Sequence, residues 1–143
     1  ITKNNLGAVA GVNGDRSKAA QLFGQAGSAP EVSYNKGIIA IQNGKYDAAV
    51  SSFGSESTFN KALAELLSKK EDAAVKTIDA SKDKESGQGY YLKAIAAAHS
   101  NNLTKVVENL KAAIAKDAAW KAKAAKDREF LKYAEDASMS FIK

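Results

Sequence analysis

A segment that occurs four times along the chain is the feature that most constrains its fold. The four copies align without internal gaps and begin at Asn4, Tyr34, Phe59 and Tyr91. A small residue stands in the fourth place of each copy, at Gly7, Gly37, Ala62 and Ala94. A second marker lies at Ala19, Ala49, Ala74 and Val106, and a large apolar residue follows each of these four places later. Both markers repeat with the same steps of 30, 25 and 32 residues, which indicates a true internal repeat.

Each copy reads as a helix, a turn and a second helix. In the second copy, Pro30 suits the first turn of a helix, and apolar residues follow it at helical spacing. Asn43 and Gly44 end that helix, because both residue types tolerate the left-handed conformation beyond a helix end. Alanine is the most frequent residue and only one proline is present, which also favours helix. Because one helix pair cannot bury its apolar face alone, the sequence predicts an all-α fold of stacked pairs.

The copies resemble tetratricopeptide repeat (TPR) units, in which a Leu-Gly pair is followed by a small residue and then by Ala-x3-Phe. The first copy, NNLGAVAGVNGDRSKAAQLF, matches through Leu6, Gly7, Ala10, Ala19 and Phe23. The second, YNKGIIAIQNGKYDAAVSSF, matches through Gly37, Ala40, Tyr46, Ala49 and Phe53, and the two later copies match through fewer residues. The resemblance implies a right-handed α-α superhelix (a solenoid) of about four TPR-like units, at about residues 1–29, 30–55, 56–86 and 87–116.

The sequence departs from the TPR pattern at several places. The step of 25 residues is short for this family, and we expect it to shorten a helix or the loop at residues 54–58. Glu65 stands where a small residue is expected, and the polar segment 81–89 reads as a flexible loop. Lysine replaces the leucine of the first copy in the other three, at Lys36, Lys61 and Lys93.

Residues 117–143 follow the last copy and read as a C-terminal cap of a single domain that spans residues 1–143. We expect one amphipathic helix and a short second one, with Asp117 and Asp127 as N-caps. Apolar contacts of the cap are expected from Trp120, Phe130, Leu131 and Tyr133.

No equivalent cap precedes the first copy. Ile1 is not an initiator methionine, so we expect a chain excised from a longer one. Either earlier repeats were removed, or the face that carries Leu6 and Val9 meets a partner or another copy. The oligomeric state predicted from this face is a monomer or a weak homo-oligomer.

Composition excludes most catalytic and metal chemistry. The chain has no cysteine and one histidine, which removes thiol chemistry, thiolate metal sites and nearly all His-centred catalysis. The Gly-Lys pair at Gly44 and the Gly-Gln-Gly run at residues 87–89 do not complete phosphate-binding loops. His99 is expected on the surface near a helix end. The sequence therefore predicts no catalytic residue, no cofactor and no metal site.

The net charge of +5 does not by itself indicate a nucleic-acid partner. The basic excess lies in the last third of the chain, where acidic residues are interleaved with it, and it lacks the dense stripe and aromatic platforms of such a site. The apolar stretches are too short to cross a bilayer, so no membrane insertion is expected. The compartment stays open between the cell envelope or periplasm, which we favour, and the cytoplasm.

The resemblance also implies a concave groove lined by the first helix of each pair. One asparagine per copy, at Asn5, Asn35 and Asn60, would bond the backbone of an extended peptide. An apolar floor would come from Ile38, Leu63 and Ile95, and aromatic anchors from Tyr34, Phe59 and Tyr91. The alternative for each of these residues is a structural role between neighbouring helices.

Three classes of function remain. The one we favour is a non-catalytic scaffold that binds a peptide or a segment of a partner protein in that groove. The alternative is a structural spacer or oligomerisation module of a larger, cell-envelope protein. An enzyme or nucleic-acid binder comes third, because no catalytic constellation or nucleic-acid footprint is present in the sequence.

Overall fold

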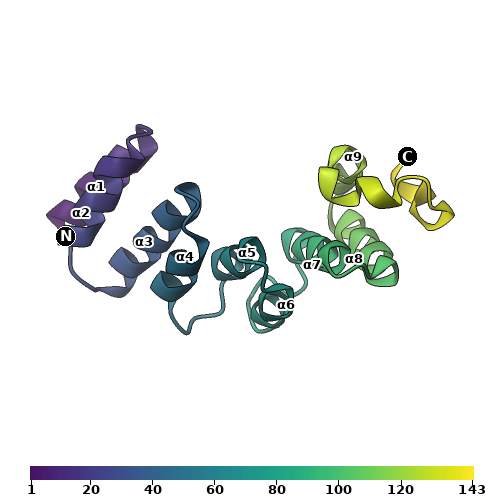
Figure 1. Ribbon diagram of the computed structural model, residues 1–143, viewed down its shortest axis with the longest axis horizontal. Helices are drawn as coiled ribbons and strands as arrows, with labels where there is room; N and C mark the ends of the chain where they lie inside the picture. The colour runs from purple at the N-terminus through teal and green to yellow at the C-terminus, as the bar shows by residue number, and fades with distance from the viewer. The chain divides into compact units, whose positions relative to one another are not determined.

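A computed structural model describes all of residues 1–143 and contains helices and no strands (Figure 1). The all-α prediction is therefore confirmed. Contacts divide the chain into two compact units, Ile1–Glu56 and Ser57–Lys143. The first unit contains α1 (Thr2–Val12), α2 (Arg16–Gln25), α3 (Pro30–Gln42) and α4 (Tyr46–Phe53). The second contains α5 (Phe59–Leu67), α6 (Glu71–Asp79), α7 (Gly87–His99), α8 (Leu103–Lys116) and α9 (Ala119–Lys126), followed by two 3₁₀ helices, η1 (Arg128–Tyr133) and η2 (Ala137–Ile142).

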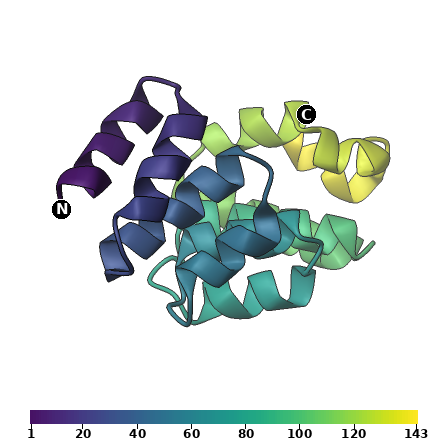
Figure 2. The ribbon, with the colours of Figure 1, turned by 60° about the vertical axis from the view of Figure 1, so that its left-hand side comes forward.

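The helices pack in consecutive pairs, as the repeat predicts. In the first unit α1 packs on α2 and α3 on α4, and α2 joins the pairs by packing on α3 (Figure 2). In the second unit α5 packs on α6 and α7 on α8, and α6 joins the pairs by packing on α7. The order of contacts is that of a helical repeat within each unit. The right-handed superhelix stays a prediction.

All four pairs turn in the same way between their two helices. The second residue after each helix end has a left-handed backbone, with φ of 82° at Gly14, 72° at Gly44, 61° at Lys69 and 56° at Asn101. The next residue donates its backbone N–H to the carbonyl five places back, in the Asp15–Ala10, Lys45–Ala40, Lys70–Glu65 and Asn102–Ala97 hydrogen bonds of 2.9, 2.8, 2.9 and 2.9 Å. This long hydrogen bond across a left-handed residue is the Schellman ending of a helix. The helix stop expected at Asn43 and Gly44 is thus confirmed, and the first helix of each of the other three pairs ends in the same way.

Each pair is held by the two markers found in the sequence. The small residue of the first helix faces the large apolar residue of the second, so the ring of Phe23 lies over Gly7 and that of Phe53 over Gly37. In the second unit, Ala62 and Ile78 share one apolar cluster, and Ala94 and Leu110 share another. Glycine thus faces phenylalanine, whereas alanine faces the smaller isoleucine or leucine. The core lies between the helices of each pair and continues between pairs, because Ile39 of α3 packs with Phe23, and Leu92 and Ala96 of α7 pack with Ile78.

Two of the three lysines that replace Leu6 bind the linker before their own helix. Lys36 donates from Nζ to the carbonyl oxygen of Gly27 at 2.8 Å. Lys93 donates from Nζ to the carbonyl oxygen of Lys84 at 3.4 Å and to Oδ1 of Asp79 at 3.0 Å. Both lysines reach nine residues back along the chain, and they satisfy carbonyl groups that no helix pairs.

The linker before α7 is compact, which corrects the flexible loop predicted at residues 81–89. Asp83 is buried; its backbone N–H donates to Oγ of Ser81 at 3.1 Å, and its Oδ1 accepts from Nε2 of Gln88 at 2.7 Å. Ser86 caps α7, which begins at Gly87 inside the predicted loop. A side chain at Gly89 would meet the carbonyl oxygen of Asp83, so the backbone of the linker and the first turn of α7 are in direct contact.

The short repeat step shortens helices, as expected. The helices on either side of residues 54–58 are α4, with 8 residues, and α5, with 9. The corresponding second and first helices of the other pairs have 9 to 14 and 11 to 13 residues.

The C-terminal segment differs in part from the prediction. Asp127 caps η1 as expected, with its Oδ1 accepting from the N–H of Glu129 at 3.0 Å. However, Leu131 is 61% exposed, whereas Met139 and Ile142, which were not predicted to contribute, are buried. The reason is the 3₁₀ geometry, in which residues three apart lie on the same side. Phe130 and Tyr133 therefore both face the core, and Leu131 between them does not.

Candidate functional site

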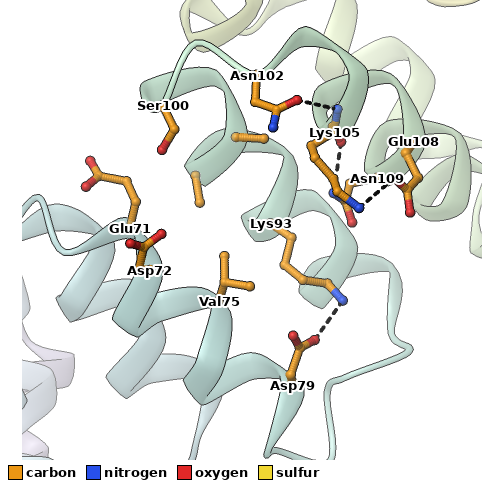
Figure 3. A pocket seen from close by; sticks show the side chains of 12 residues that line it. Glu71, Asp72, Val75, Asp79, Lys93, Ser100, Asn102, Lys105, Glu108 and Asn109 are labelled. Carbon is orange, nitrogen blue, oxygen red and sulfur yellow. Dashed lines mark hydrogen bonds and ion pairs between the residues drawn. The ribbon is translucent and has the colours of Figure 1, made fainter.

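A groove of the second unit lies between α6 and α8, above α7 (Figure 3). Its volume is about 320 Å³, and it is open to solvent along one side. Val75 of α6 and the adjacent Ala96 and Ala97 of α7 form its apolar floor. Small side chains on α7 leave the space, because larger ones would fill the gap between the two flanking helices. The run of alanines in α7 is thus the local cause of the groove.

Ion pairs occupy the end of the groove away from the start of α6. Nζ of Lys93 lies 3.0 Å from Oδ1 of Asp79, and Nζ of Lys105 lies 3.0 Å from Oε2 of Glu108. Asn109 joins this wall by donating from Nδ2 to the carbonyl oxygen of Lys105 at 2.8 Å. Each lysine of the groove therefore has a carboxylate partner, so this end offers hydrogen-bonding groups without a net positive charge.

The opposite end of the groove is acidic. Glu71 and Asp72 stand in the first turn of α6, where carboxylates are stabilised by the helix dipole. Figure 3 shows both carboxylates beside Ser100, across the groove from the lysines. Asp72 is exposed and makes no ion pair, whereas Oε1 of Glu71 lies 3.3 Å from Nδ1 of His99. The groove therefore combines an apolar floor, one end whose lysines are paired with carboxylates, and one end lined by the carboxylates of Glu71 and Asp72.

The residues predicted to form a groove in the first unit are only partly brought together. Asn35 and Ile38 of α3 help to line a shallow depression of about 230 Å³, which α1 borders through Ala8. Asn5 is exposed and does not line it; the neighbouring Asn4 instead accepts a hydrogen bond at Oδ1 from Nδ2 of Asn35, at 3.0 Å. The predicted aromatic anchor of this unit, Tyr34, is 41% exposed and packs edge-on against a core phenylalanine of α4, with ring centroids 5.5 Å apart.

The predicted residues of the second unit serve mainly as packing groups. Phe59 and Leu63 are half-buried against the cluster that contains Ile78, and Ile95 packs against both clusters of the unit. Asn60 is half-buried in the first turn of α5. These four residues do not line the groove between α6 and α8.

Tyr91 belongs to the core, which is the structural alternative considered for it. Its ring is 3% exposed and stacks on Trp120, with centroids 4.7 Å apart. Its hydroxyl donates to Oδ2 of Asp127 at 2.6 Å, and so ties α7 to the start of η1. Burial, together with the hydrogen bond and charge of Asp127, raises the pKa of Tyr91 well above its usual range. Its hydroxyl and ring face are therefore engaged within the protein.

Sequence reasoning missed the groove because it considered only the first helices of the pairs. The groove is formed mostly by second helices, and its residues are charged or amide side chains of a kind common on any exposed helix face. One signal was present in the sequence: the alanine run of residues 96–98 leaves room beside two polar helix faces.

Metal-binding and membrane-spanning features are absent from the structure. No group of three or more His, Asp or Glu side chains is arranged to hold a metal ion. None of the helices combines the length and the apolar character needed to cross a membrane. The chain matches no family model, and comparisons with curated proteins and with solved structures found no match.

Proposed function

We propose that this protein is a non-catalytic interaction module of the TPR-like class, and that its second unit binds an extended segment of a partner protein in the α6–α8 groove. The observation that carries the proposal is the groove itself, in which an apolar floor lies between a neutralised end and an acidic end. An apolar floor with a few polar groups at its rim is the usual composition of a binding site.

The charges of the groove define the segment that would fit. Lys93 and Lys105 are already paired, so an anionic ligand gains little there. Asp72 makes no ion pair, and with Glu71 it favours a lysine or arginine at the same end. The floor is shallow and suits a small apolar side chain next to that cation. We therefore expect a partner segment in which Lys or Arg adjoins Ala or Val.

A selection from a library of random peptides tests this proposal, followed by nuclear magnetic resonance (NMR) mapping of the bound peptide. Selected peptides should share the basic and small apolar pair and should shift the amide signals of Val75, Ala96 and Ala97. The change Asp72→Lys should weaken their binding about fivefold or more. Glu85→Lys makes the same charge change at an exposed residue outside the groove and is the matched control. Peptides that shift other residues, or that bind both variants equally, would contradict the proposal.

A second candidate function, an oligomerisation module, is favoured by the exposed face of α1. Val9 is 57% exposed, although its equivalents Ile39 and Ala96 are 6% and 2% exposed because the preceding helix pair covers them. Leu6 and Val12 are exposed on the same helix, which lies at the edge of the first unit (Figure 2). Such a face would support a weak homo-oligomer, because a single helix buries less surface area than a stable dimer interface does.

Sedimentation at increasing protein concentration tests the second candidate. If α1 mediates association, the mean mass should rise with concentration and Val9→Asp should abolish that rise. Lys18→Asp, on the exposed side of α2, is the control for added negative charge. A mass that stays constant up to millimolar concentration would rule this candidate out.

A further inference from the structure

The ring of His99, the only histidine of the chain, lies between two carboxylates from different elements. Its Nε2 is 2.7 Å from Oε2 of Glu129 in η1, and its Nδ1 is 3.3 Å from Oε1 of Glu71 in α6. His99 is the last residue of α7, so its ring connects the C-terminal cap to the acidic end of the groove.

The protonation state of His99 decides how many of these contacts are hydrogen bonds. An ionised carboxylate only accepts, and a neutral imidazole donates from one nitrogen. Both contacts are therefore hydrogen bonds only when the ring is protonated. We infer that, after the ring loses a proton, the remaining N–H is on Nε2, because this nitrogen makes the shorter contact, to Glu129. Nδ1 then presents a lone pair to Glu71, and this contact becomes repulsive.

Other charged groups around His99 come from the elements packed against α7. Lys132 of η1 donates from Nζ to the carbonyl oxygen of Ala98 and, at 2.7 Å, to Oδ1 of Asn101. Lys69, Lys70 and Asp72 surround the start of α6 beside Ser100. Histidine is the side-chain type that ordinarily changes charge between about pH 5 and pH 8.

We propose that His99 is a pH-dependent gate on the groove, an inference that rests on the proposed function. When His99 is protonated, it neutralises Glu71 and competes with a basic residue of the partner segment. When His99 is neutral, Glu71 is released and joins Asp72 as a second carboxylate for that residue. The partner segment thus binds more tightly when the ring of His99 is neutral and is released when acidification protonates it.

Two NMR titrations with the intact chain test the gate. In the first, without peptide, the side-chain carboxyl signal of Glu71 is followed with the imidazole signals of the sole histidine. The Glu71 signal should show a step at the midpoint of the histidine titration, and His99→Gln should abolish that step. A Glu71 signal that does not respond at the histidine midpoint would overturn the gate.

In the second titration, the probe is the peptide acetyl-Ala-Arg-Val-amide. Its affinity should be about fivefold higher at about pH 8 than at about pH 5.5, the size of one exposed ion pair. His99→Gln, checked for unchanged helicity by circular dichroism, should bind equally at both values. Equal affinities for the parent at both pH values would also overturn the gate. If neither this probe nor the library-selected peptides bind at any pH, the proposed function fails, and the Glu71 step still decides whether His99 controls the carboxylate.

Discussion

The ring of Phe53 lies so close to Gly37 that a Cβ on residue 37 would come within 2.5 Å of the ring's Cε1. The same relationship joins Phe23 to Gly7. The two pairs of the second unit instead use alanine against isoleucine or leucine. The volume lost on the first helix of a pair is therefore matched by volume gained on the second.

This matching predicts the effect of Gly37→Ala. The added methyl group must displace the Phe53 ring, and overpacking of this kind costs about 1–3 kcal/mol of unfolding free energy, measured by urea denaturation. Combining it with Phe53→Leu recreates the alanine–leucine pair of Ala94 and Leu110, so the double variant should lose less than the sum of the two single losses. Gly24→Ala in α2 is the control, because no atom lies near its added Cβ, and it should stabilise the protein. Equal effects of the two glycine substitutions would contradict the matching.

The left-handed backbone of Lys69 predicts that glycine at this position stabilises the protein. Lys69 has a φ of 61°, a conformation that costs a residue with a side chain about 1–2 kcal/mol. Lys69→Gly removes that strain and should raise the unfolding free energy by about 1 kcal/mol. Gly44→Ala tests the reverse change at the equivalent turn and should destabilise by a similar amount. Thermal unfolding of both variants measures the difference, and a loss of stability in Lys69→Gly would show that the turn is not strained.

A buried hydrogen bond explains how Glu65 replaces a small residue. Oγ1 of Thr77 donates to Oε2 of Glu65 at 2.6 Å, and both side chains are buried. Thr77→Val keeps the shape and removes the donor, so a buried carboxylate loses its partner at a cost of about 1–3 kcal/mol. Thr77→Ser keeps the hydroxyl, so it should lower the unfolding free energy less than Thr77→Val does. Denaturant unfolding at neutral pH measures both losses. The reverse order would show that the methyl group of Thr77 matters more than its hydroxyl.

The raised pKa of Tyr91 predicts a loss of stability in alkali. Burial favours the neutral phenol, so the folded protein holds this proton more tightly than the unfolded chain does. The stabilisation is fully present below the ordinary tyrosine pKa of 10.0 and is lost as the pH rises above it. Between about pH 8 and pH 11, the unfolding free energy should therefore fall further in the parent than in Tyr91→Phe. At about pH 8, Tyr91→Phe should be less stable by about 1 kcal/mol, because Asp127 loses a donor. An equal fall with pH in both proteins would contradict the assignment.

The helix pairs and their turns were predictable from the sequence, because each depends on residues within one copy. Gly37 and Phe53, for example, belong to the same copy and meet in the same pair. Contacts between copies were harder to predict. Alignment of the copies pairs Asn35 with Asn5, yet the structure brings Asn35 to Asn4. Equivalent positions in two helices need not touch, because the crossing of the helices sets which side chains meet.

The groove was beyond prediction for the same reason. Its floor joins Val75 of one pair to Ala96 and Ala97 of the next, so it depends on how α6 packs against α7. Leu131 was assigned wrongly because it was selected for its apolar side chain alone, whereas in η1 it lies off the side that Phe130 and Tyr133 share.

The shared turn geometry has a consequence for how such a chain can change length during evolution. The left-handed residue, the long hydrogen bond and the small-to-large contact all lie within one helix pair. A duplicated or deleted pair would therefore keep its own turn and its internal small-to-large contact, and the join would fall in a linker such as residues 54–58. Recombination at linkers can then alter the number of pairs and leave the surviving ones intact.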